Sequence, residues 1–313
     1  MKNALRIFFV TDIHGSNVCW RKFLNALRIY NTDVGIIMGD LTGKMLIPLV
    51  KVGTDHWETN FLGRNEEVHT QEELSRLKRI IEMVGYYWKE LSPDEFLHFK
   101  EDSVALESLF RDLMFQRLKE WIALADERLK GSPYRVYMSP GNDDLLEVEE
   151  VIAQSETIIN CGDSVVKVDN YEMATFSWAN PTPWQTPREK TDEELEPMLE
   201  ELLSKVENFS TAIFNFHAPP YGTSLDLAPQ LDKNLVQAVE KKVHVGSKAV
   251  LKMIQKYQPM LGLHGHIHES RGMLRIGRTV IVNPGSEYSE GILKGVVVTL
   301  QGGKVKDCVF TSG

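Results

Sequence analysis

The stretch Leu5-Arg6-Ile7-Phe8-Phe9-Val10-Thr11-Asp12-Ile13-His14 decides the fold, because an apolar run ends on a carboxylate and an imidazole. Short apolar runs bounded by turn residues are typical of buried strands. The arrangement recurs along the chain, where runs 33–38, 134–138, 212–216 and 260–263 precede Asp40, Asn142, His217 and the segment His264-Gly265-His266-Ile267-His268. The sequence therefore predicts several buried strands that each end on a polar group.

These polar groups have the chemistry of metal ligands. In open α/β sheets, ligands bind outside the carboxyl ends of the strands, so we expect the strand ends to meet in one crevice. Imidazole nitrogens and carboxylate oxygens suit borderline first-row ions, and a two-metal site needs about seven such groups with one bridging carboxylate. Each residue alone is more simply explained as a turn or capping residue. Together, in this order, they predict a two-metal site.

The same blocks resemble those of the calcineurin-like metallophosphoesterases, whose pattern runs D-x-H, G-D, G-N-H-[DE], H and G-H-x-H. The corresponding residues are Asp12-Ile13-His14, Gly39-Asp40, Gly141-Asn142-Asp143-Asp144, His217 and Gly265-His266-Ile267-His268. The third block matches only in part. The tail 264–270, followed by Asn283-Pro284-Gly285-Ser286, resembles the small prokaryotic members. The resemblance covers residues 4–45 and 132–313 and implies an α/β fold, a two-sheet sandwich flanked by helices.

The resemblance also implies which residue binds which ion. One divalent ion would be held by Asp12, His14 and His268, the other by Asn142, His217 and His266, and Asp40 would bridge them. His264 is expected to support a ligand from outside, since coordinating imidazoles commonly need an outer partner. The resemblance favours Mn²⁺ and allows Fe, Zn or Ni, because ligand softness alone does not choose among these metals.

Position 143 departs from the family pattern. The family commonly has a His there, proposed to protonate the leaving group, and this chain has Asp143. Asp143 is a candidate general acid if burial raises its pKa, although nearby cations would lower it. The alternative is that Asp143, with Asp144, caps a helix beginning at Leu145. Segment 39–44 also lacks the Asp and Arg of the phosphoprotein phosphatases, which argues against that branch.

Composition limits the class of protein. The chain has 313 residues, 42% of them hydrophobic, which suffices for a large core. Its three cysteines lack C-x-x-C spacing, which predicts free thiols in a reducing compartment. The first apolar run is too short for a signal peptide, and no run reaches transmembrane length, so we expect a cytoplasmic protein without a membrane partner. A net charge of -9 provides no basic footprint for duplex nucleic acid.

Residues 46–130 lie outside the resemblance and form a predicted insertion in a single domain that spans residues 1–313. Runs 44–53 and 55–63 indicate a hairpin, and apolar residues at helical spacing over 74–84 and 104–124 indicate helices interrupted at Pro93. We therefore expect a mainly helical cap that shapes substrate access. A purely structural insertion, or one that forms a homo-oligomer interface, is the alternative. His56, His69 and His98 are expected not to be ligands.

Two later segments have features of substrate-binding loops. Loop 218–223 follows His217 and offers Tyr221 and Thr223 as candidates for substrate contact. Trp178 and Trp184 lie in the loop 178–187, where packing is the favoured interpretation and stacking on a nucleobase is the alternative. Helices are predicted over 193–208 and 247–257.

The predicted function is hydrolysis of a phosphodiester or an activated phosphomonoester by hydroxide formed between two divalent ions. Asn142 would help to hold the phosphoryl oxygens. The expected partner is a small phosphorylated substrate such as a nucleotide. One alternative function is a nuclease of the same fold, which the negative net charge of the chain disfavours. The other is a catalytically silent metal-binding scaffold, which Asp143 permits but the complete ligand set disfavours.

Overall fold

Two six-stranded sheets form the centre of the computed structural model, which describes residues 4–231 and 237–313. The first sheet has the order β18-β17-β1-β2-β7-β8, with β1 (Leu5–Thr11), β2 (Val34–Met38), β7 (Arg135–Ser139), β8 (Ile158–Asn160), β17 (Lys294–Gln301) and β18 (Lys304–Ser312). The strands β1, β2, β7 and β8 pair in parallel. Their carboxyl ends therefore lie at one edge of the sheet.

The second sheet has the order β15-β16-β14-β11-β10-β9. Its strands are β9 (Val165–Val168), β10 (Tyr171–Phe176), β11 (Ile213–Phe216), β14 (Leu261–Leu263), β15 (Gly272–Ile276) and β16 (Thr279–Asn283). The four strands β10, β11, β14 and β16 are parallel. Every apolar run that precedes an expected ligand is thus a buried strand in one of the two sheets, as predicted.

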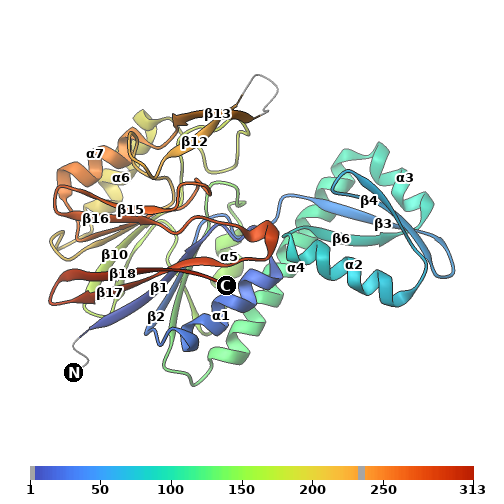
Figure 1. Ribbon diagram of the computed structural model, residues 1–313, viewed down its shortest axis with the longest axis horizontal. Helices are drawn as coiled ribbons and strands as arrows, with labels where there is room; N and C mark the ends of the chain where they lie inside the picture. The colour runs from blue at the N-terminus through green and yellow to red at the C-terminus, as the bar shows by residue number, and fades with distance from the viewer. Residues whose placement is uncertain (1–3, 232–236) are drawn as a thin grey trace.

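Apolar side chains hold the layers together. Phe9 and Ile36 of the first sheet and Ile213 and Leu261 of the second belong to one buried cluster between the sheets. The outer face of the first sheet is covered by α1 (Asn17–Ile29), part of α4 (Ser103–Leu129) and α5 (Val148–Ile152). The second is covered by α6 (Asp192–Leu203) and α7 (Lys248–Tyr257). Figure 1 shows this arrangement, which confirms the predicted sandwich flanked by helices.

The insertion stands to one side of the two sheets in Figure 1. It contains a four-stranded sheet of order β5-β4-β3-β6, with β3 (Leu46–Gly53), β4 (His56–Phe61), β5 (Arg64–Val68) and β6 (Tyr87–Leu91). Its helices are α2 (Gln71–Met83), α3 (Pro93–Glu101) and the start of α4. The hairpin of β3 and β4 follows the prediction. The strand β5 gave no signal because only its last residue, Val68, is buried.

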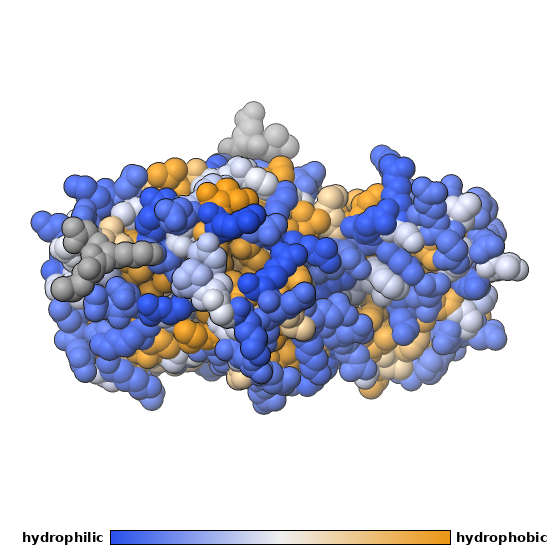
Figure 2. All heavy atoms as spheres, turned by 90° about the horizontal axis from the view of Figure 1, so that it is seen from below, coloured by the Kyte–Doolittle hydropathy of each residue, from blue (hydrophilic) through white to orange (hydrophobic). Residues whose placement is uncertain are grey.

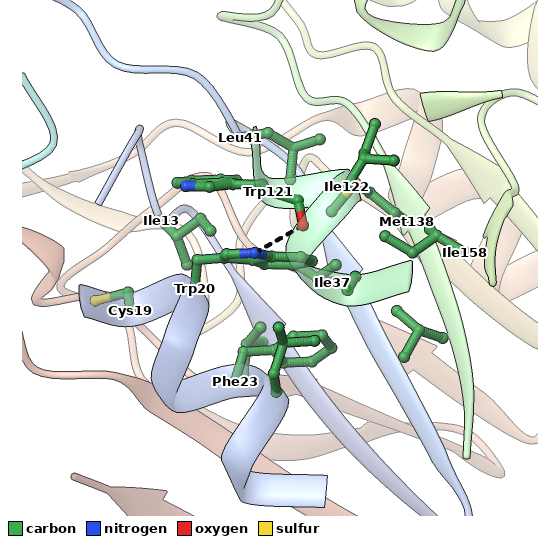
Figure 3. Close-up of a cluster of buried hydrophobic side chains, with 14 of the residues drawn as sticks. Ile13, Cys19, Trp20, Phe23, Ile37, Leu41, Trp121, Ile122, Met138 and Ile158 are labelled. Atoms are coloured by element: carbon green, nitrogen blue, oxygen red, sulfur yellow. Dashed lines mark hydrogen bonds between the residues drawn. The ribbon is translucent and has the colours of Figure 1, made fainter. Parts of the chain in front are cut away.

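Helix α4 belongs to both parts of the molecule. Its beginning is exposed at Val104, whereas Leu118, Trp121 and Ala125 lie in the core beneath the first sheet. Trp121 stacks on Trp20 of α1 with ring centroids 5.3 Å apart, and the Trp20 indole N–H donates to the Trp121 carbonyl (Figure 3). The predicted insertion boundary near residue 130 therefore falls after a stretch that already packs in the core.

The connection between β11 and α7 contains a further two-stranded sheet, β12 (Leu227–Leu231) with β13 (Gln237–His244), which the sequence did not indicate. The last short helix, η1, spans Tyr288–Glu290. Among the described residues, no helix combines the length and apolar character that crossing a bilayer requires. On the face shown in Figure 2, hydrophilic residues predominate and apolar residues gather in small groups between them.

Candidate functional site

The expected ligands all follow parallel strands of the two sheets. Asp12 and His14 follow β1, Asp40 follows β2, Asn142 follows β7, His217 follows β11, and His266 and His268 follow β14. The structure brings these side chains together at the edge where the strands end. The convergence that the strand-end pattern predicts is therefore present in the fold.

The carboxylates and imidazoles form two groups: the first is one expected ligand set, and the second joins the two histidines of the other set with the expected bridge, Asp40. In the first group, the ligand atoms of Asp12, His14 and His268 lie within 4.8 Å of one another. The Nε2 atoms of His14 and His268 are 3.1 Å apart. Two imidazoles that bind one tetrahedral ion at about 2.0–2.1 Å place their nitrogens roughly 3.4 Å apart, so the observed spacing suits a shared ion. The second group consists of Asp40, His217 and His266.

Asp40 faces both groups. Its Oδ2 is 3.7 Å from Nε2 of His14 in the first group, and its Oδ1 is 3.4 Å from Nε2 of His217 in the second. The backbone N–H of Asp143 donates to Oδ1 over 3.0 Å and fixes the carboxylate. One carboxylate with an oxygen toward each group has the geometry of a bridging ligand.

Asn142 is oriented by a chain of hydrogen bonds. Its Nδ2 donates to Oγ1 of Thr186 over 2.8 Å, and that hydroxyl donates to Oε1 of Glu189 over 2.6 Å. The amide oxygen Oδ1 consequently points to the second group, 2.9 Å from Nε2 of His217. Sequence reasoning missed Thr186 and Glu189, because a lone Thr and Glu in a loop carry no pattern.

One carboxylate oxygen of Asp12 has no hydrogen-bond partner, and this indicates whether a cation fits between the groups. Oδ2 of Asp12 accepts hydrogen bonds from the Thr11 hydroxyl and the His266 N–H. Oδ1 is buried without a hydrogen-bond partner, 3.6 Å from Nε2 of His268 and 3.9 Å from Nε2 of His217. A buried carboxylate oxygen without a partner is costly, and a cation between these atoms would remove that cost. Imidazole with carboxylate is a donor set that suits divalent first-row ions.

The backbone around the ligands is held in an unusual conformation. Four expected ligands have positive φ: Asp12 (54°), His14 (37°), Asp40 (41°) and His266 (67°). Residues other than glycine rarely adopt this region, and such outliers cluster at functional sites. The neighbouring Gly265 is required by close approach, since a Cβ there would lie 2.0 Å from Oγ1 of Thr11.

Burial and charge determine the protonation of the site. Burial raises the pKa of the Asp40 carboxyl, but the neighbouring His217 outweighs it and leaves that pKa well below its usual range. Burial lowers the pKa of His266 to about 4, so its ring is in the neutral form that coordinates metals. For His217, burial lowers the pKa, but Asp40 and Asp12 raise it to about 9. The ionised carboxylates thus favour positive charge at the site.

His264 lies in neither group. Its Nδ1 is 2.9 Å from the carbonyl oxygen of Phe216 and 3.1 Å from that of Ala218, so the Nδ1–H donates to both. Burial lowers the pKa of His264 to about 4. The neutral ring therefore ties the end of β14 to the residues on either side of His217, which is the supporting role that the sequence predicts.

Asp143 lies beside the first group. Its carboxylate forms an ion pair with Lys44, and its Oδ2 is 3.7 Å from Nδ1 of His14. Burial and the negative Asp40 raise the pKa of Asp143 to about 7, although Lys44 opposes them. Asp143 can therefore take up or release a proton near neutral pH. Its pairing with Lys44 was not predicted from the sequence.

The alternative role of Asp143 and Asp144 as helix caps is wrong. The helix α5 begins at Val148, and its N-cap, Glu147, makes no capping side-chain bond. Asp144 instead accepts the backbone N–H groups of Leu41, Thr42 and Gly141 over 2.9 Å each. It thereby joins the loop after β7 to the loop after β2, which carries Asp40.

A cavity of about 430 Å³ opens over the expected ligands. Asp40, Asn142, Asp143, His266 and His268 form its polar end. Lys44, Ile267 and Glu269 also line it, and the remaining walls come from residues 181–184 and 228–231 and from Val243 and Val245. Residues 46–130 are all described and none of them lines this cavity, so the structure gives the expected cap no contact with it. The loops of the second sheet occupy that position instead.

The loop residues differ from the expectations. Tyr221 and Thr223 do not line the cavity, because the Thr223 hydroxyl donates to the carbonyl of Pro220 and Tyr221 packs toward His244. Trp178 packs against the apolar cluster beneath α6 and α7, and its indole donates to Asp163 over 2.9 Å, which confirms the packing interpretation for that residue. Packing is wrong for Trp184, which lines the cavity and is 62% exposed.

The insertion carries a third group with metal-ligand spacing. Nε2 of His56 and Nε2 of His69 each lie 3.6 Å from Oε2 of Glu67. Glu67 and His69 are exposed, unlike the two buried groups. The two histidines were expected not to be ligands, and the proximity of the three side chains was not visible in the sequence because β5 itself was not.

Comparisons with known proteins agree with this geometry. Residues 5–270 match the calcineurin-like phosphoesterase family. A protein of Methanocaldococcus jannaschii, uncharacterized protein MJ1162, is 34% identical over 147 residues, which are 46% of this chain and 61% of that protein. The match thus spans less than two thirds of the relative's length.

Solved structures share the fold at low sequence identity. TT1561 of Thermus thermophilus aligns over 95% of this chain and 99% of its own with a TM-score of 0.52 and 14% identity. Another solved chain aligns over 98% of both chains with a TM-score of 0.57 and 14% identity. With the family match covering residues 5–270, this chain belongs to the calcineurin-like phosphoesterases.

Proposed function

We propose that the chain is a two-metal phosphoesterase that hydrolyses phosphodiesters or activated phosphomonoesters. The observation that carries this proposal is the position of Asp40, whose two oxygens face separate ligand groups at 3.7 Å and 3.4 Å. A scaffold that binds a single ion would have no use for a carboxylate shared in this way. The family match and the cavity beside Asp40 add support.

Each group of residues has a defined task in this proposal. Asp12, His14 and His268 would hold one divalent ion, and Asn142, His217 and His266 the other, with Asp40 between them. Bound divalent ions, for which we propose Mn²⁺, supply Lewis acidity and lower the pKa of water. Asn142, held by Thr186, directs its amide oxygen to the second group. Glu189 in turn fixes Thr186, so the whole arrangement is ready before substrate arrives.

The charges in the cavity favour a phosphodiester. Among the described residues that line the cavity, Lys44 is the one lysine or arginine, and it is paired with Asp143. Glu269 adds a further carboxylate to the lining. A diester has a single negative charge on its phosphoryl group, whereas a monoester has up to two, so the diester requires less positive charge from the protein.

Asp143 is the proposed proton donor to the leaving oxygen. Its side chain lines the cavity next to Asn142, and it contacts Lys44 and the ring of His14. A positioned acid lets an alkoxide leave as an alcohol, which is the task of the family histidine that this chain lacks. Lys44 would hold the Asp143 carboxyl toward the substrate.

A small phosphorylated substrate fits better than a nucleic acid polymer. Proteins that track a nucleic acid backbone use a positively charged groove, whereas the described residues that line this cavity include one lysine and several carboxylates. The chain as a whole has a net charge of -9. A nuclease activity is therefore the weaker candidate.

The test is a screen of metals against substrates. Chelator-treated protein is reloaded with Mn²⁺, Fe²⁺, Zn²⁺ or Ni²⁺ and given p-nitrophenyl phosphate, bis-p-nitrophenyl phosphate, cyclic nucleotides and single-stranded DNA. We expect metal-dependent hydrolysis, with the diesters cleaved faster than the monoester and the DNA cleaved least. Protein that binds two ions but hydrolyses none of these compounds would contradict the proposal and favour a silent scaffold.

A further inference from the structure

We propose that the cavity contains a subsite for an aromatic ring, with Trp184 as its platform, and that the substrates of this chain carry a flat aryl or nucleobase group on one ester oxygen. This inference rests on the proposed function, because the ring is placed relative to a phosphoryl group at the ligand groups. It specifies the substrate class that the family match leaves undefined.

The first support is the chemistry of the cavity walls. Besides the expected ligands, the lining includes Pro181, Pro183 and Trp184 from one loop and Leu231 and Val243 from β12 and β13. These side chains carry no charge. The cavity therefore combines the polar side chains of the expected ligands with a substantial apolar lining, as small-molecule sites usually do.

The second support is the exposure of Trp184. The chain has six tryptophans, all in the described part, and Trp184 is the exposed one, at 62%. An indole left in water forgoes the large hydrophobic gain that burial of a tryptophan provides. Within the cavity, the exposed ring is available to stack on a flat group of the ligand. Tryptophan offers a broad π-face that stacks on any base or aryl ring.

The third support is the rigidity of the loop that carries Trp184. The backbone N–H of Trp184 donates to Oγ1 of Thr182, and the Thr182 hydroxyl donates to the Glu189 carboxylate. The next residue, Gln185, is held at a φ of 52°, which is rare for a residue with a side chain. A platform fixed in advance loses little conformational entropy when the ligand binds.

The carboxylate of Glu189 connects the loop that carries Trp184 to the expected ligand groups. Glu189 accepts from Thr182 on the platform side and from Thr186, which orients Asn142. Burial raises the pKa of Glu189, but these hydrogen bonds outweigh it and lower the pKa, which keeps the carboxylate ionised. The distance between an aromatic ring and a phosphoryl group is thereby set by one hydrogen-bonded loop.

The size of the cavity limits what this ring can belong to. A volume of about 430 Å³ lies near the lower end of the range for small-ligand sites, about 300–1,000 Å³. The space suits a single phosphoryl group with one ring system. We therefore infer a small aryl ester or a mononucleotide-sized ester.

The experiment measures binding, so that it does not depend on turnover. Isothermal titration calorimetry of the Mn²⁺-loaded protein with methylphosphonate, phenylphosphonate and adenosine 5′-monophosphate compares Trp184→Ala, Trp184→Phe and wild type. Trp178→Phe is the matched control, because Trp178 lies in the same segment but does not line the cavity. Circular dichroism confirms that each variant is folded.

We expect Trp184→Ala to weaken phenylphosphonate or the nucleotide by about 10-fold or more, while methylphosphonate is unchanged and Trp184→Phe retains most of the affinity. Loss confined to the nucleotide identifies a nucleobase site, and loss confined to phenylphosphonate identifies an aryl site. Equal affinities in Trp184→Ala and wild type for both aromatic ligands would overturn the subsite. Failure of all three ligands to bind wild type would instead count against the proposed function.

Discussion

The two sheets contribute different chemistry to one site. The first sheet supplies Asp12, His14, Asp40 and Asn142, so it provides every expected carboxylate and amide ligand. The second sheet supplies His217, His266 and His268, all of them imidazoles. The loops differ as well: Arg117 of the insertion's last helix binds the loop after β1, whereas the loops after β10 and β11 supply the cavity walls away from the expected ligands.

The two sheets therefore have different tasks: the first positions the charged side chains, and the second determines the shape of the cavity. On the first sheet, Arg117 of α4 donates to the carbonyl oxygens of Gly15 and Tyr86, which ties the loop after His14 to the insertion. In the second sheet, residues 181–184 and the paired strands β12 and β13 line the cavity next to the expected ligands. The first sheet with the insertion thus fixes the anionic ligands, and the second sheet shapes the space for substrate.

The largest effect is expected from the carboxylate that both groups share. Asp40→Asn should lower metal content below two ions per chain and abolish detectable hydrolysis, because the bridging negative charge offsets the repulsion between two cations. Elemental analysis after dialysis measures the ions, and turnover of bis-p-nitrophenyl phosphate measures activity. The exposed Asp307 provides the matched control, since Asp307→Asn should change neither. Two tightly held ions with full activity in Asp40→Asn would remove the bridge from the mechanism.

The convergence of the expected ligands could be predicted from the sequence because each lies just beyond an apolar run. A strand end fixes where a neighbouring side chain lies, so Asp12, Asp40 and His217 could be expected to converge before any contact was known. The two-sheet sandwich, by contrast, was predicted from the resemblance to the family and not from the strand ends. The contacts of the Asp40 carboxylate with the His14 and His217 rings, by contrast, are visible only in the folded structure.

The rest of the site depends on contacts between distant segments. Lys44 meets Asp143 across 99 positions only because the loops after β2 and β7 are adjacent. Thr186 and Trp184 lie in a loop whose path is set by hydrogen bonds to Glu189 rather than by periodicity. The polar strand β5 gave no apolar signal, which is why the four-stranded sheet of the insertion was missed.

The second prediction tests whether the insertion is separate from the first sheet. Trp121→Ala should lower the free energy of unfolding by about 3–5 kcal/mol, because the ring is buried and stacks on Trp20. Leu97→Ala, on the exposed part of α3, should stay within about 0.5 kcal/mol of wild type. Denaturant titration followed by circular dichroism gives both values.

The same packing predicts the result of removing the insertion. Replacing residues 46–129 with a short linker takes Leu118, Trp121 and Ala125 out of the core beneath the first sheet. We therefore expect insoluble protein. Recovery of a soluble, metal-binding chain would show that α4 is dispensable to the core and would restore the simpler picture of a detachable cap.

The third prediction concerns the first-sheet residue that has no family counterpart. Asp143→Asn should slow hydrolysis of an alkyl phosphoester by about 10²-fold, the typical size of a general-acid contribution, and barely affect p-nitrophenyl esters, which leave without a proton. Asp143→His should restore the rate on the alkyl ester. Steady-state kinetics on the two substrates give the comparison. Equal slowing of both would mean that Asp143 acts on the metal ligands or on binding rather than on the leaving group.

The smallest effect tests a place where the second sheet's loops position a residue of the first sheet. Asn142 follows β7 of the first sheet, but Thr186, which orients it, lies in the loop after β10 of the second. Thr186→Val keeps the shape of the side chain and removes the hydroxyl. Outer partners of metal ligands typically contribute about 10- to 100-fold to metal affinity, and we expect the lower end here because Asn142 is neutral.

The weakening should be confined to one of the two ions, because Asn142 is expected in the second group and Asp12, His14 and His268 do not contact Thr186. Calorimetric titration of the metal-free protein should therefore resolve one site weakened by about 10-fold and one site unchanged. Thr223→Val is the matched control, since its hydroxyl donates to Pro220 away from the cavity. Equal weakening of both sites would show that the loop supports the fold rather than Asn142. Unchanged affinity at both would mean that His217 and Asp40 hold the second ion without help from the amide, which would confine the second sheet's loops to shaping the cavity.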